Sequence, residues 1–249
     1  MAVAIDASTP AIKSAGDTTP AFLDSNSFTP PAGSRVWLLV GWDAGGSQSA
    51  PTITTQTGPT LTWTGPASVV TAGGKAWVWW ANISSSTAYV IRVDLGTVAF
   101  PGCCVLPLVV TGGETTPGAF RATTDTGLNV AGTHYQYCVG GWVHRTQSIG
   151  IGTPFTPIAT GSILICITTG WSGGTQWVVD SNQTLVASDR SATNYQCIIT
   201  RLTGTTTQGV PVNMGVSSAG TSESGDMHII ELRAGAGGAA RSGWGRVSI

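Results

Sequence analysis

Short apolar segments alternate with turns rich in glycine, proline and serine along most of this chain. The segments are rich in valine, isoleucine, threonine, tryptophan and tyrosine, which favour β-strands. The pattern predicts strands at residues 35–42, 61–64, 75–81, 88–95, 104–111, 135–144, 162–169, 176–180, 195–203, 210–216 and 227–233. No long stretch has the i, i+3, i+4, i+7 apolar spacing of an amphipathic helix. The sequence therefore predicts an all-β protein.

The segment 75–81 is predicted to be a central strand. Successive side chains of a strand point to opposite faces of its sheet. This places Trp77 and Trp79 on one face and Ala76, Val78 and Trp80 on the other. Both faces are apolar, so we expect both to be buried.

The segment 227–233 has a different pattern. Its alternation sets His228, Ile230 and Leu232 against Ile229, Glu231 and Arg233. Because the second set carries two charged residues, we predict that this face of the strand is exposed to solvent. His228 then lies on the apolar face, as a core or interface histidine.

The predicted strands fit one domain over residues 24–233, a jelly-roll-like antiparallel β-sandwich. Residues 1–23 are predicted to form an extended N-terminal arm or edge strand, and residues 234–249 a glycine-rich C-terminal tail. Such a tail cannot bury enough apolar surface to order itself. We expect both ends to pack against neighbouring subunits, with Arg241, Trp244 and Arg246 as subunit contacts. The alternative is a tail folded back on its own domain.

The charge content limits the possible partners. Charged residues make up 9% of the 249 residues and the net charge is −1, whereas about 25% is typical of soluble domains. Without a basic cluster, nucleic-acid binding is not expected. The N-terminus lacks the pattern of an export signal, and no apolar run reaches the ~18 residues of a membrane span. We therefore expect synthesis in the cytoplasm and no membrane insertion.

Few residues suggest catalysis or metal binding. The five cysteines lack metal-ligand spacing and are predicted to be small core residues, with a disulfide or a metal site as alternatives. With three histidines and no hydrolase or metalloprotease motif, we predict a protein that is not an enzyme and needs no cofactor or metal. A carboxylate pair of a glycosidase stays a distant alternative.

Ten tryptophans exceed what the core of such a domain usually needs. Trp171 precedes a Ser-Gly-Gly loop, with Trp177 and Asp180 just beyond it. Because exposed aromatic planes stack on sugars, these three residues form a candidate glycan patch. The alternative is that Trp177 packs in the core and Trp171 covers one end of the sandwich. Large aromatic residues with few charges also suit a subunit interface, which we favour over the glycan patch.

Four motifs occur in a characteristic order. They are SFTPPAGS at 27–34, LTWT at 61–64, VVTG at 109–112 followed by TTP at 115–117, and IELRA at 230–234. In this order they resemble a β-sandwich module of virion structural proteins of phages that infect actinobacteria. The tryptophan-rich strand, the pair Cys103 and Cys104 and the glycine-rich tail depart from that module.

The resemblance implies a structural protein of the particle that associates with other virion proteins and forms a homo-oligomer. We predict a minor tail protein of a tailed bacteriophage. A head decoration protein in a symmetric oligomer is the alternative in the same class. A carbohydrate-binding module that adsorbs the particle to a host cell-surface glycan is the alternative from another class.

Overall fold

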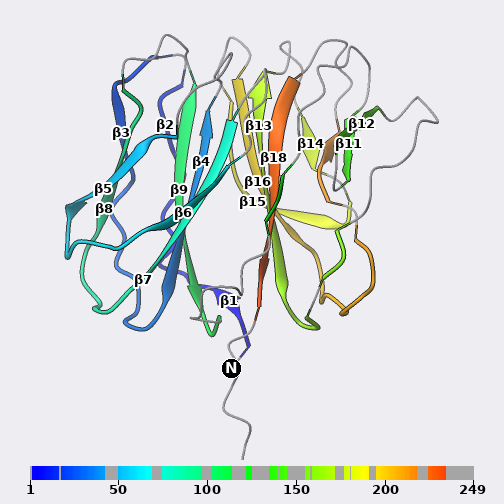
Figure 1. Ribbon diagram of the computed structural model, residues 1–249, viewed down its shortest axis with the longest axis horizontal. Coiled ribbons are helices and arrows are strands. Elements are labelled where there is room, and N and C mark those ends of the chain that lie inside the picture. Colours follow the sequence, from blue (N-terminus) through cyan, green and yellow to red (C-terminus); the bar gives the residue numbers. More distant parts are fainter. Residues whose placement is uncertain are drawn as a thin grey trace, which may run out of the picture.

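The chain forms stacked antiparallel β-sheets in the computed structural model (Figure 1). The structure describes residues 2–16, 18–42, 50–68, 75–96, 102–113, 122–124, 135–138, 141–144, 155–157, 159–171, 177–179, 181–190, 195–212, 214–217 and 224–233. Within these residues every regular element is a β-strand, and every strand pair is antiparallel. The predicted all-β, antiparallel fold is therefore confirmed.

Three sheets carry most of the strands. The central sheet has the order β1 (Ala4–Ile5), β9 (Cys103–Thr111), β4 (Arg35–Trp42), β7 (Lys75–Asn82) and β6 (Thr64–Ser68), and β2 (Lys13–Ser14) also pairs with β9. The C-terminal sheet has the order β10 (Ala122–Thr124), β18 (Ser224–Leu232), β13 (Ile163–Trp171), β16 (Tyr195–Leu202) and β15 (Gln183–Arg190). The three-stranded sheet has the order β3 (Phe22–Asp24), β8 (Val90–Asp94) and β5 (Thr52–Thr57). Two short pairs join β11 (Tyr135–Cys138) to β12 (Gly141–His144) and β14 (Val178–Val179) to β17 (Val216–Ser217).

The central sheet is buried on both faces, so the stack has three layers. On one face Leu38 and Trp77 pack with Ile91 of the three-stranded sheet. On the other face Leu39 and Val78 share a core with residues of the C-terminal sheet. In Figure 1 the three-stranded sheet lies at the left, the central sheet in the middle and the C-terminal sheet to its right.

The prediction for segment 75–81 is confirmed by this layering. Trp77 and Trp79 belong to the core beneath the three-stranded sheet. Ala76, Val78 and Trp80 belong to the core beneath the C-terminal sheet. Strand β7 therefore lies between β4 and β6 with both of its faces covered.

The burial of Glu231 contradicts the prediction that one face of segment 227–233 is exposed to solvent. Its side chain is 0% exposed, and its neighbour on the same face, Ile229, is also buried. Phe155 and Met214 pack against Ile229 on the outer face of the C-terminal sheet. The expected solvent-exposed face is wrong because segments from outside the sheet cover it. The side chain of His228 lies outside the described residues.

Several strand boundaries also differ from the prediction. Residues 61–63 precede β6, 135–144 is a pair of strands, and 210–216 contributes an isolated bridge at Val212 before β17 begins. The strands β5 and β15 were not predicted. Both end their sheets. Strand β5 is mostly threonine with exposed polar positions, and β15 has only three consecutive apolar residues, 185–187, among polar ones.

The N-terminal segment runs along its own domain. Strands β1 and β2 pair with β9, and β3 pairs with β8. Three short strands therefore occur in the segment predicted as an arm or edge strand, and the last of them, β3, ends at Asp24. The C-terminal tail, 234–249, lies outside the described residues.

Candidate functional sites

The outer face of the three-stranded sheet is the first candidate site. Its inner face is buried through Ile91 and Val93, so the alternate residues of each strand point outward. Cross-strand pairing places these outward residues in two rows, Phe22–Asp94–Thr52 and Asp24–Arg92–Thr54. We call these six residues the outer face.

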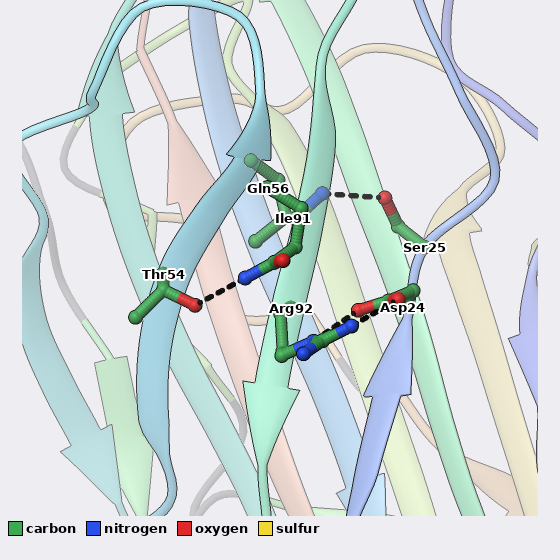
Figure 2. A network of polar contacts seen from close by, with 6 residues as sticks. All are labelled: Asp24, Ser25, Thr54, Gln56, Ile91 and Arg92. Atoms are coloured by element: carbon green, nitrogen blue, oxygen red, sulfur yellow. Dashed lines mark hydrogen bonds and ion pairs between the residues drawn. The ribbon is translucent and has the colours of Figure 1, made fainter.

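An ion pair organises the outer face. Arg92 Nε and Nη2 donate to the two carboxylate oxygens of Asp24 at 2.7 and 2.8 Å, as Figure 2 shows. This hydrogen bonding lowers the pKa of Asp24 below its ordinary value and raises the pKa of Arg92. The bidentate geometry fixes the plane of the guanidinium group.

The same guanidinium group lies over an exposed aromatic ring. The carbon atom Cζ of Arg92 is 3.7 Å from the centroid of the Phe22 ring, which is cation–π geometry. The Phe22 side chain is nevertheless 45% exposed. The outer face therefore presents a positioned aromatic ring and a positioned arginine, the residue types that dominate binding at protein interfaces.

One neighbouring hydrogen bond joins β8 to the residue that follows β3, and another lies within β5. The backbone N–H of Ile91 donates to Ser25 Oγ at 3.0 Å, and Gln56 Nε2 donates to Thr54 Oγ1 at 3.1 Å (Figure 2). The pairing of β5 with β8 shifts by one residue between Thr55 and Thr57. A bulge at a sheet edge changes the local twist, and here it lies at the Gln56 end of β5.

A groove between β14, β15 and β16 is the second candidate site. Its volume is about 230 Å³. The lining residues are Trp177, Val178, Val179, Leu185, Ser188, Asp189, Arg190, Gln196 and Ile198. Val178 and Leu185 are exposed apolar side chains, whereas Ser188 and Arg190 bring a hydroxyl and a charged group. The groove can therefore contact both apolar and polar parts of a ligand.

Trp177 forms a buried part of this groove. It is 2% exposed and packs with Ile198 and Val216. Its backbone N–H donates to Gln196 Oε1 at 2.9 Å. Stacking on a sugar requires an accessible ring face, so Trp177 does not present a platform of the kind expected for the glycan patch.

The other residues predicted for function lie partly or wholly outside the described residues. The Trp171 backbone ends β13, whereas its side chain and all of Asp180 lie outside the described residues. The same holds for Arg241, Trp244 and Arg246. The glycan patch and the tail contacts stay predictions.

The cysteines whose side chains the structure describes are core residues, as predicted. Cys103, Cys104, Cys166 and Cys197 are all buried and have free thiols. The side chain of Cys138 lies outside the described residues. No group of three or more potential metal ligands occurs within the described part of the chain.

Comparison with known protein families, characterised proteins and solved structures finds no match. The described residues also contain no helix with the length and apolar character required to cross a membrane.

The described residues of three motifs behind the phage resemblance lie near one small hollow. The first motif turns at Gly33, where φ is +82° and the N–H donates to the Ile83 carbonyl at 2.8 Å. This turn leads into β4, whose first residue, Arg35, pairs with Val110 of the VVTG motif. Arg35 and Val110 line one small hollow together with Leu232 of the IELRA motif. Three motifs far apart in the sequence thus form one structural unit.

Proposed function

We propose that this chain is a non-enzymatic structural subunit of a tailed bacteriophage virion, a minor tail protein that assembles through subunit contacts. The observation that carries this proposal is the outer face, where Arg92 and Asp24 hold the exposed Phe22 ring in a fixed setting. Because the side chains are already positioned, a partner that covers them loses little additional side-chain entropy on binding. The order and the proximity of the resemblance motifs support the phage assignment.

The edge of the three-stranded sheet provides a second means of contact. Strand β5 ends this sheet, and its residues Thr52, Thr54, Gln56 and Thr57 are exposed. A terminal strand can add a strand from a neighbour through backbone hydrogen bonds. This type of contact needs few charged side chains, which suits a chain with 9% charged residues.

Substitution of Phe22 by alanine is expected to reduce incorporation of the chain into particles by about tenfold or more, the loss typical of a residue at the centre of an interface. The measurement is the amount of this chain in purified particles, relative to the major head protein. Val210→Ala is the matched control, because Val210 is an exposed apolar residue near Pro157, on the side of the C-terminal sheet. This control is expected to be incorporated normally.

Two results would contradict the proposal. Normal incorporation of Phe22→Ala would show that the outer face makes no assembly contact. Absence of the unsubstituted chain from purified particles would overturn a structural role in the virion. Separation of heads from tails, followed by detection of the chain in each fraction, distinguishes a tail protein from a head decoration protein.

The groove favours a second candidate function, binding of a host cell-surface glycan. Its combination of apolar side chains with Ser188 and Arg190 provides both packing and hydrogen bonding for a sugar. Ser188→Trp introduces a bulky side chain into the groove and is expected to abolish retention of the chain by purified host cell-wall glycan. The same variant is expected to assemble normally, whereas Phe22→Ala is expected to retain glycan binding. Retention of Ser188→Trp at the level of the unsubstituted chain would contradict the glycan function of the groove.

A further inference from the structure

Two cysteines face each other across the interface between the central and C-terminal sheets. In the central sheet Cys104 lies between Ser14 and Gly41 in neighbouring strands. In the C-terminal sheet Cys197 lies between Asp189 and Thr169. Both cysteines belong to the same core, with exposures of 0%.

Gly41 brings the two sulfur atoms close together. A Cβ atom at Gly41 would lie 2.9 Å from Cys197 Sγ and 3.0 Å from Cys104 Sγ. The two sulfur atoms therefore cannot be more than about 6 Å apart, since both lie within about 3 Å of one point. Because glycine has no side chain, that point is empty and the two sulfur atoms can approach each other.

Further contacts fix the two sheets relative to each other at this level. The Tyr195 hydroxyl donates to the Gly41 carbonyl at 3.1 Å, which joins β16 to β4. The Ser14 hydroxyl donates to the Asp189 carboxylate, which joins β2 to β15. The two thiols are thus held opposite each other by hydrogen bonds on either side.

The other described cysteines are placed differently. Cys103 points into the core on the opposite face of the central sheet. Cys166 points to the opposite face of the C-terminal sheet, toward Phe155 and Met214. Of the cysteines whose side chains are described, Cys104 and Cys197 are therefore the pair whose side chains share a core.

We propose that Cys104 and Cys197 form a disulfide that links the central sheet to the C-terminal sheet when the chain meets a small disulfide oxidant such as oxidised glutathione. One thiolate attacks the oxidant, which releases one reduced glutathione and leaves a mixed disulfide on the protein. The second thiolate attacks the protein sulfur of that mixed disulfide and releases a second reduced glutathione. The two cysteines lose two electrons and two protons, and the oxidant takes up both.

The environment of the pair determines when this reaction occurs. Burial raises the pKa of the Cys197 thiol well above its ordinary value, and the neighbouring Cys104 thiol raises it further. The thiolate is the reactive form, so oxidation of the closed sheets is slow. Transient separation of the two sheets admits both the oxidant and water, and reclosure then brings the two sulfur atoms together.

The test uses the full chain, incubated with oxidised glutathione in a denaturant concentration just below the unfolding transition. The expected product has lost two hydrogen atoms by intact mass, and its proteolytic digest contains a peptide that joins Cys104 to Cys197. After removal of the oxidant, its denaturation midpoint is expected to be higher than that of the reduced chain, because the bond constrains a long loop in the unfolded state. A reductant is expected to restore the original midpoint.

Two variants serve as controls. Cys166→Ala removes a thiol outside this core and is expected to yield the same cross-linked peptide. Cys197→Ala is expected to yield none. An unchanged mass of the unsubstituted chain, a cross-link that involves Cys103 or Cys166, or a cross-linked product with a lower midpoint would each overturn the proposal. Because the readout is made on the isolated chain, its outcome is independent of the virion function.

Discussion

Replacement of Trp77 by alanine is expected to lower the free energy of unfolding by about 3–5 kcal/mol, the range found when a large aromatic side chain is removed from a well-packed core. Trp77 is fully buried in the middle of β7, between the central and three-stranded sheets. Its ring lies against Trp42, with 5.7 Å between the two centroids and a tilt of 41°. Neither sheet can close over the space that the indole leaves without disturbing the other.

Equilibrium denaturation in guanidinium chloride measures this loss, and Phe22→Ala provides the matched control. Both variants remove an aromatic side chain, but Phe22 lies on the outer face and is partly exposed. The control is therefore expected to lose much less stability. Equal losses for the two variants would contradict the three-layer arrangement, since that arrangement is what buries both faces of β7.

Central strands were predictable because their own sequences are apolar on both faces. The predicted segment 35–42 coincides with β4, all eight residues of which are buried. The alternation in 75–81 also assigned each tryptophan to the correct face. A strand that is apolar on both sides needs no knowledge of its partners to be recognised.

The third layer was not predictable in the same way. Its strand β5 is mostly threonine with exposed polar positions, and β3 has only three residues, two of them in the segment that was interpreted as an arm. The pairing of β3 with β8 joins residues such as Phe22 and Asp94 that are far apart in the sequence. A local pattern of polar and apolar residues carries no information about such partners, so the number of layers had to come from the structure.

The candidate sites show the same limit. Phe22 and Arg92 belong to different strands, and their contact depends on the pairing of β3 with β8. The sequence around Gly41 does not indicate that two sulfur atoms from different sheets lie beside it. In contrast, Trp177 was prominent in the sequence but is buried, because a tryptophan count does not distinguish a core residue from a binding platform.

Glu231→Ala is expected to lower the free energy of unfolding by about 2–4 kcal/mol, because buried donors that lose their acceptor retain the full cost of desolvation. The Glu231 carboxylate accepts hydrogen bonds from the Ala159 backbone N–H at 3.1 Å and from the Ser162 hydroxyl at 2.9 Å. It therefore ties the turn before β13 to β18 at a site with no access to water.

This cost extends to the neighbouring chain segment. Ser162 Oγ lies 2.8 Å from Thr206 Oγ1, and Thr206 Oγ1 donates to the Ser162 carbonyl at 2.9 Å. Without the carboxylate, the Ser162 hydroxyl loses one partner of a buried network that also holds the segment around Thr206. Partly satisfied buried networks are especially unfavourable, because the low local dielectric strengthens the penalty for each unpaired group.

Two further substitutions separate this explanation from a simple loss of packing. Glu231→Gln retains an oxygen acceptor of the same shape and is expected to lose less stability than Glu231→Ala. Thr184→Ala, which removes one side of the exposed hydrogen bond between Thr184 and Thr203, is expected to change the stability by about 0.5 kcal/mol or less. Chemical denaturation of all three variants provides the comparison. If Glu231→Ala lost no more stability than Thr184→Ala, the carboxylate would have to lie in solvent, as the alternation in 227–233 predicted, and the covered outer face of the C-terminal sheet would be wrong.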